Sequence, residues 1–238
     1  MAELSIEVTG AEVEPNAAVP TIMFATHLRE SSGATIHAIA LRAQIRIEPQ
    51  RRRYSAAEEE RLLELFGETP QWGESLRPFL WSHVETMVAG FADETTVSLP
   101  MACSYDFEVA GAKYLHSLET GSDPDGTAPS SPGEDGASAV GGQRGGVVPL
   151  LFLFSGTVFT RGESGFAAEL IPWHLESRFR LPVRTWRETM DRYFPNAGWL
   201  RLSRETIDRL QRFRAERALP TWEQAIEALL KEAGEDGV

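Results

Sequence analysis

The stretch VPTIMFATHLRE, residues 19–30, and the stretch ATIHAIALRAQIRIEP, residues 34–49, decide the fold class. In the second stretch isoleucines alternate with polar residues such as Arg42 and Arg46, which is the period of a strand with one buried face and one solvated face. Ser31-Ser32-Gly33 lies between the two stretches and predicts a short turn that joins them as a hairpin. These residues therefore indicate an antiparallel sheet.

Strand patterns continue on both sides of this region. The apolar positions change parity between Ile36 and Ile39, which predicts a bulge near Ala38. The chain also alternates from Leu4 onward, and no long helices alternate with the strand segments, so the pattern predicts an antiparallel sandwich or barrel rather than a parallel Rossmann-type sheet. The further strand segments, broken by Pro and Gly, are residues 79–88, 95–118, 147–160 and 165–183.

Helix signals are few before residue 183 and dominate after it. Ser55 and Glu58 form a capping-box pattern that opens one inserted helix near 55–66, and a second such pattern, Thr221 with Gln224, opens the last helix. We expect a single α+β domain over residues 1–238. Its parts are a mainly antiparallel β-sandwich over 3–182, with the inserted helix, and C-terminal α-helices over 183–233.

Residues 119–146 have a different composition from the rest of the chain. They contain eight Gly, three Pro and five acids, with hardly any large apolar side chains. Such a segment buries too little surface to offset its ordering entropy, so it predicts a disordered loop between strands at 104–118 and 147–160. Either a tolerated insertion or a partner-binding loop fits this composition.

The composition excludes several classes of protein. With 35 acids against 23 bases the chain is acidic, at a net charge of -12, which argues against nucleic-acid binding. No stretch approaches the ~18 apolar residues that a membrane span needs, and one cysteine cannot make a disulfide scaffold. The acidic start of the sequence lacks the features of a secretory signal, so we expect a cytoplasmic protein.

Catalytic motifs are absent from the sequence. Metal spacings of histidine, GxSxG, GxGxxG and the P-loop pattern do not occur, so the sequence predicts no catalytic residue, no metal and no cofactor. Cys103 lies in an apolar context typical of a structural thiol, with a nucleophile as the alternative. A hydrolase with a dispersed active site stays open if His83, His116 or His174 meets a carboxylate and a hydroxyl in a pocket.

One concentrated basic patch follows the second strand. Basic side chains in an acidic protein can orient an acidic partner, and an adjacent Trp can anchor it. The alternative is that these arginines form internal ion pairs, with Glu58–Glu60 or with Asp106 and Glu108. The predicted partner-binding residues are Arg46, Arg51, Arg52, Arg53 and Trp72. Six Trp residues also leave open a small-ligand or carbohydrate-binding module, which needs two or three Trp on one exposed concave face.

Several stretches resemble an uncharacterised bacterial protein family, a domain of unknown function found near nickel–iron hydrogenase genes in high-GC Gram-positive bacteria. The stretches are IEPQRRRYSAAEEERLLELFGETPQW, LPMACSYDFEVAGAKYLHSL, VPLLFLFSGTVF, LPVRTWRETMDRYFPNAGWLRL and LPTWEQAIEALL. The resemblance implies a non-catalytic accessory or assembly protein whose protein partner is a hydrogenase subunit or maturation factor. It implies no catalytic residues, and it leaves the oligomeric state open.

Overall fold

The computed structural model describes residues 3–104, 106, 109–120, 146–162, 165–195 and 200–234. The chain divides into two compact units, Met1–Gly198 and Trp199–Val238. The strands all belong to the first unit. They are β1 (Leu4–Val13), β2 (Thr21–Glu30), β3 (Ile36–Ile47), β4 (Phe79–Phe91), β5 (Glu94–Ala102), β6 (Val147–Gly162), β7 (Gly165–Leu170) and β8 (Glu176–Pro182).

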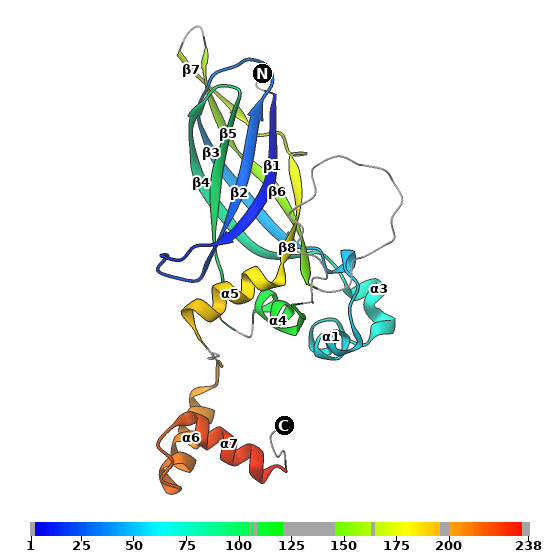
Figure 1. Ribbon diagram of the computed structural model, residues 1–238, viewed down its shortest axis with the longest axis vertical. Helices are drawn as coiled ribbons and strands as arrows, with labels where there is room; N and C mark the ends of the chain where they lie inside the picture. The colour runs from blue at the N-terminus through cyan, green and yellow to red at the C-terminus, as the bar shows by residue number, and fades with distance from the viewer. Residues whose placement is uncertain are drawn as a thin grey trace. The chain divides into compact units, whose positions relative to one another are not determined.

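Helices of the first unit gather at one end of the strands (Figure 1). They are the 3-10 turns η1 (Pro49–Arg51) and η2 (Thr69–Gln71) and the helices α1 (Ala56–Arg61), α2 (Leu63–Phe66), α3 (Trp72–Ser75), α4 (Ala110–Ser117) and α5 (Val183–Tyr193). The second unit contains α6 (Arg204–Glu216) and α7 (Trp222–Glu232). The predicted helix near 55–66 is present as two short helices, α1 and α2, with Leu62 between them as the C-cap of α1 and the N-cap of α2.

The strands form two antiparallel sheets. One sheet has the order β1-β2-β5, and the other has the order β4-β3-β6-β7, with β8 also paired to β6. At one edge the sheets are bridged by a side chain, since the backbone N–H of Val8 on β1 donates to Ser177 Oγ on β8 at 3.0 Å. This architecture confirms the predicted α+β class, a mainly antiparallel β-sandwich with C-terminal helices.

The core lies between the two sheets because each central strand turns every second side chain inward. Phe24 on β2 meets Phe152 on β6, with ring centroids 5.0 Å apart in an edge-to-face arrangement. On β3 the isoleucines supply the buried face, as the alternation predicts, and Ile39 and Ile45 are fully buried. The predicted bulge near Ala38 is confirmed by a register shift between Ile36 and Ala38 in the pairing with β6.

The predicted hairpin between residues 19–30 and 34–49 is wrong. β2 pairs with β1 and β5, whereas β3 pairs with β4 and β6 in the other sheet, so the connection between them is an arch. Glu30 holds this arch through its carboxylate. Its Oε1 accepts from the N–H of Glu3 at 3.0 Å and of Ser32 at 2.9 Å, and its Oε2 accepts from the N–H of Ala34 at 2.9 Å.

This carboxylate makes the arch sensitive to acid. Burial by itself raises the pKa of Glu30, but hydrogen bonds from Ser32, Glu3 and Ala34 outweigh it and lower the pKa from 4.5 to about 2. The ionised carboxylate therefore stabilises the fold above the unfolded-state pKa. That stabilisation is lost as the pH falls through the range from 4.5 to about 2.

We expect Glu30→Gln to lower the free energy of unfolding at neutral pH by about 1–3 kcal/mol, because an amide cannot accept all of these hydrogen bonds. The variant should also lose most of the pH dependence of stability below pH 4.5 that Glu30 contributes. Urea denaturation at a series of pH values measures both effects. Glu7→Gln, at an exposed position of β1, is the control. A parallel pH profile for wild type and Glu30→Gln would contradict this role.

The predicted strand over 104–118 is also wrong, because residues 110–117 form α4. The buried positions Gly111, Tyr114, Leu115 and Leu118 follow the i, i+3, i+4, i+7 spacing of a helix face. The Gly111 backbone packs so closely on the indole of Trp81 that an added Cβ would lie 2.7 Å from Trp81 Cδ1. Most of the predicted disordered loop, residues 121–145, lies outside the described residues.

Candidate functional site

The predicted basic patch is divided between the interior and the surface. Arg52 is buried, and its Nη2 donates to Glu58 Oε1 in an ion pair whose two side chains are each 1% exposed. Glu58 also accepts from the N–H of Ser55 at 3.0 Å and from the N–H of Glu119 at 2.7 Å. Arg52 thus makes an internal ion pair of the kind that the alternative interpretation of the patch predicts.

Two tyrosines extend this buried cluster. Tyr54 Oη lies 2.8 Å from Tyr114 Oη and donates to the Pro49 carbonyl at 2.8 Å, while the Arg52 guanidinium lies 5.4 Å from the centre of the Tyr54 ring. Burial raises the pKa of both hydroxyls, that of Tyr114 to about 12. Both tyrosines therefore stay neutral at physiological pH, and the cluster connects η1 to α4.

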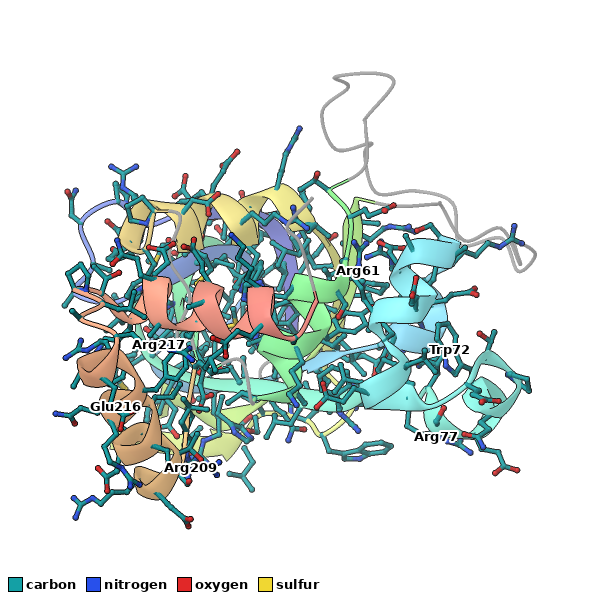
Figure 2. The ribbon with its side chains drawn as sticks, turned by 90° about the horizontal axis from the view of Figure 1, so that it is seen from below. Arg61, Trp72, Arg77, Arg209, Glu216 and Arg217 are labelled. Carbon is teal, nitrogen blue, oxygen red and sulfur yellow. The ribbon has the colours of Figure 1, made fainter. Side chains whose placement is uncertain are left out.

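Trp72 belongs to the same core. Its ring packs edge-to-face on Tyr54 at 5.2 Å, and its Nε1–H donates to the Gly67 carbonyl at 2.9 Å. Figure 2 shows Trp72 within the helical end of the first unit. Trp72 therefore joins α3 to Tyr54 and to the C-terminal end of α2.

The other arginines of the patch lie nearer to solvent. Arg46 Nη2 donates to the Pro78 carbonyl at 3.1 Å, and Arg51 Nε lies 3.1 Å from Glu48 Oε2. Arg51 and Arg53 are exposed. Two of the five predicted residues, Arg52 and Trp72, are therefore buried. The other three, Arg46, Arg51 and Arg53, form a surface set. Partner binding by the surface set stays a prediction.

A groove of about 490 Å³ lies on the outer face of the five-stranded sheet, since Ala40 and Arg42 at the groove alternate along β3 with the buried side chains that face the core. Its lining comes from three adjacent strands, β4, β3 and β6. The lining residues are Ala40, Leu41, Arg42, Glu85, Thr86, Met87, Ser155, Gly156 and Thr157. We call this site the outer-face groove.

Strand register explains the shape of the groove. Ala40 lies opposite Met87 on one side and opposite Thr157 on the other, and Thr157 lies opposite Leu170 on β7. Directly paired residues point to the same face of a sheet, so these four side chains form one row across four strands. The small Ala40 lies between larger side chains, and this difference in size hollows the face.

The ends of this row expose large apolar side chains to solvent. Met87 is 66% exposed and Leu170 is 80% exposed. Trp173 is 91% exposed and lies between β7 and β8, where Ile171 N–H donates to the Gly156 carbonyl at 3.0 Å. Met87 and Leu170 thus lie at the two ends of one row, and exposed apolar side chains grouped on one face are typical of a binding surface, whereas single ones are ordinary.

Polar groups line the rest of the groove. Arg42 Nη2 and Glu85 Oε1 form an ion pair of 2.5 Å across β3 and β4, and Ser155 lies opposite Arg42 on β6. One pair further along, Gln44 Nε2 lies 3.3 Å from His83 Nε2. The groove thus combines an apolar row with a row of hydrogen-bonding groups, which can fix the orientation of a bound chain.

Sequence reasoning missed this site for a specific reason. The alternation in residues 34–49 places Arg42 and Arg46 on the polar face of their strand, but it does not reveal which apolar residues of neighbouring strands share that face. Met87 shares the parity of His83 and Glu85, so a large apolar side chain directly after two polar ones on the same strand face was the available signal. No comparable signal exists for Leu170, because its alignment with Met87 depends on pairing across four strands.

The histidines and the cysteine do not come together at the outer-face groove. His83 contacts Gln44, the His116 ring packs on Trp186 at 4.7 Å, and His174 packs on Trp173 at 6.0 Å. Burial, followed by the positive charge of Arg187, lowers the pKa of His116, although Asp191 opposes this. Burial raises the pKa of the Cys103 thiol to about 12, so the thiol stays protonated. These positions give no support to the hydrolase alternative.

The described residues also provide no exposed face with two or three Trp side chains on which a sugar could stack. Trp72 and Trp186 are buried, and Trp81 is half-buried against Gly111. Trp173 and Trp222 are exposed, and each is the one exposed Trp among the described residues of its own unit. Within the described ranges no group of three or more His, Cys, Asp or Glu side chains is arranged to hold a metal ion. None of the helices described is both long and apolar enough to cross a membrane.

Comparisons with known proteins identify a family but no activity. A family model described as "Family of unknown function (DUF6084)" matches residues 1–125 and 138–238. No curated protein matches the chain.

Two solved structures resemble the chain distantly. The crystal structure of an ApaA protein from Bordetella pertussis shares 11% identity over 76% of this chain and 94% of that chain, with a TM-score of 0.25. A β-glucosidase from Kluyveromyces marxianus shares 6% identity over 75% of this chain and 15% of that chain, with a TM-score of 0.25. Neither likeness carries an argument about function.

Proposed function

The chain belongs to the DUF6084 family, and we propose that it is a non-catalytic accessory protein whose outer-face groove binds an amphipathic helix of a protein partner. The observation that carries the proposal is a row of four side chains on the outer face. Its end residues, Met87 and Leu170, have large exposed apolar side chains, and Ala40 and Thr157 between them have smaller ones. Apolar side chains exposed in this arrangement gain stabilisation when a complementary surface covers them.

The width of the groove supports a helix as the occupant. Met87 and Leu170 lie on strands separated by three inter-strand steps, which amounts to about 14 Å at the usual strand spacing of about 4.8 Å. A helix with its side chains is about 10–12 Å across, so it fits between the two side chains. An additional β-strand would instead need an unpaired strand edge, whereas at the centre of the groove Ala40 on β3 is paired with β4 and β6, and Thr157 on β6 is paired with β3 and β7.

Charge indicates which kind of helix binds. The protein carries a net charge of -12, which attracts a helix with Lys or Arg beside its apolar face and raises its association rate. Arg42 and Glu85 at the groove can pair with charges on both sides of the apolar face. The proposed partner is therefore a basic amphipathic helix with large apolar residues at i, i+3 or i+4, and i+7.

The biological setting is a further part of the proposal. The family resemblance described above implies an assembly role beside nickel–iron hydrogenase, so the helix is proposed to belong to a hydrogenase subunit or maturation factor in the cytoplasm. Binding of the purified subunits, compared between wild type and the groove variants below, tests this assignment separately from helix binding itself.

We expect Met87→Asp combined with Leu170→Asp to abolish helix binding, because carboxylates would remove the apolar contacts at both ends of the row. The probe is a displayed library of 20-residue peptides selected on the wild-type protein. Enriched peptides should carry the helical apolar spacing, and their affinity for the double variant should fall at least about 30-fold. Fluorescence anisotropy with synthetic copies of the enriched peptides measures the loss.

The matched control is Val19→Asp combined with Leu63→Asp, which adds the same charge at two exposed apolar positions outside the groove. This control should retain full affinity for the peptides. The proposal is overturned if enriched peptides lack the helical spacing, or if they bind the groove variant and the control equally well. Circular dichroism and thermal unfolding of both variants establish that each is folded.

A further inference from the structure

Two arginines of β8 lie beside the surface set of the predicted basic patch. Arg46 on β3 lies opposite Leu151 on β6, and Leu151 lies opposite Arg178 on β8, so these three side chains form a row on the outer face of the five-stranded sheet. Arg180 follows two residues later on the same face of β8. We call Arg46, Arg51, Arg178 and Arg180 the arginine cluster.

A buried carboxylate holds two members of the arginine cluster in place. Glu48 Oε2 lies 3.1 Å from Arg51 Nε and 3.4 Å from Arg178 Nε. The Glu48 side chain is 6% exposed, whereas those of Arg51 and Arg178 are 52% and 46% exposed. The two guanidinium groups are thus fixed from the interior while about half of each side chain stays accessible, which reduces the entropy that a partner's binding would cost.

The acids around the arginine cluster do not cancel its charge. Glu48 is buried, and Glu176 Oε1 lies 2.6 Å from Arg178 Nη1. Arg77 and Glu74, next to the Pro78 carbonyl that accepts from Arg46, add one exposed charge of each sign. Four arginines against two glutamates leave the cluster positive by two charges, in a chain whose net charge is -12.

The two ends of the row provide different contacts. At one end, Arg180 beside Arg178 is exposed and forms no ion pair with another residue in the described part of the chain. At the other end, Leu80 on β4 lies opposite Arg46 and is 47% exposed. Leu80 therefore supplies the apolar contact that the sequence assigned to Trp72, which is buried. Arginines beside an apolar side chain are the combination that contributes most at protein interfaces.

We propose that the arginine cluster, together with Leu80, binds an acidic segment of a protein partner that carries a large apolar residue. Guanidinium groups bind carboxylates through paired hydrogen bonds, and Leu80 packs on the apolar residue. The acidic remainder of the chain repels a long polyanion such as a nucleic acid, whereas a short acidic segment contacts the cluster alone. This surface is separate from the outer-face groove, whose lining includes none of these four arginines.

Peptide selection on the full chain tests the proposal. The probe is a displayed library of 12-residue peptides in which half of the positions are Asp or Glu and the others are random. Enriched peptides should carry a large apolar residue, and raising the salt concentration should weaken their binding. Fluorescence anisotropy with synthetic copies should show at least about a 10-fold loss of affinity for Arg178→Gln combined with Arg180→Gln, and at least about a 3-fold loss for Leu80→Ser.

The matched control is Arg29→Gln combined with Arg192→Gln, which removes the same charge at exposed positions of β2 and α5 and should retain the affinity within about 2-fold. Arg180→Glu, which breaks no ion pair between described residues, should reproduce the loss without altering the contacts of Glu48. Thermal unfolding establishes that each variant is folded.

Three results overturn the proposal. The first is a selection in which no acidic peptide is enriched. The second is equal binding of the enriched peptides to Arg180→Glu and to the control. The third is a single-stranded oligonucleotide of 12 nucleotides that binds the wild type as tightly as the peptides do.

Discussion

Glu58→Ala should lower the free energy of unfolding by about 3–5 kcal/mol, because it leaves Arg52 as an uncompensated buried charge. The side chains of both residues are almost completely buried, so water cannot replace the lost carboxylate. The substitution also removes the acceptor of the Ser55 and Glu119 backbone N–H groups. Equilibrium unfolding in urea, followed by tryptophan fluorescence, measures the change.

Removing both charges should be less damaging than removing one. Within the described residues Arg52 Nε and Nη1 have no hydrogen-bond partner, so the guanidinium is incompletely satisfied even in the native protein. Arg52→Met combined with Glu58→Leu should therefore recover a substantial part of the stability lost by Glu58→Ala, as apolar replacements of buried ion pairs do elsewhere.

Glu85→Ala is the matched control, because it removes the carboxylate of an ion pair with Arg42 whose side chains are mostly exposed. Exposed pairs contribute about 0–1 kcal/mol, so this variant should stay close to wild type. Equal destabilisation by Glu85→Ala and Glu58→Ala would show that burial does not set the contribution of the Arg52–Glu58 pair.

Gly156→Ala should lower the free energy of unfolding by about 3 kcal/mol or more and should deform the outer-face groove. Gly156 has a φ of 141°, which side chains rarely adopt, and a Cβ at this position would lie 2.0 Å from the carbonyl oxygen of Ala40. The backbone of β6 would have to move away from β3, at the floor of the groove.

Gly73→Ala in α3 is the matched control, since a Cβ there meets no atom within 4 Å. Alanine is favoured over glycine in helices by about 1 kcal/mol, so this variant should equal or exceed wild type in stability. Thermal unfolding compares the two. If Gly156→Ala unfolds at the same temperature as Gly73→Ala, the close approach of β6 to β3 does not constrain the fold.

The local patterns of the sequence were sufficient for the class of the fold. Alternation in residues 34–49 predicted the buried isoleucines of β3, and its change of parity predicted the bulge near Ala38. Ser55 and Glu58 predicted the capping box that opens α1. Each of these features depends on residues within a few positions of one another, which is the range over which backbone geometry and side-chain spacing are coupled.

These local patterns did not predict which strands pair with one another or which segments pack on the end of the sandwich. Ser31-Ser32-Gly33 is compatible with a hairpin, but Glu30 draws the backbone N–H groups around it into an arch that sends β3 to the other sheet. Residues 110–117 fold as a helix where alternation predicted a strand, because Tyr114 and Leu115 meet the core at the end of the sandwich.

The sequence by itself therefore determined which residues alternate, where helices begin and how acidic the protein is, because these depend on neighbours along the chain. Only the tertiary structure decided that Arg52 is buried against Glu58, and that Met87 and Leu170 lie in one row with Ala40 between them. Burial and cross-strand alignment depend on segments far apart in sequence, and the free energy of their packing selects among arrangements that the local pattern leaves equally open.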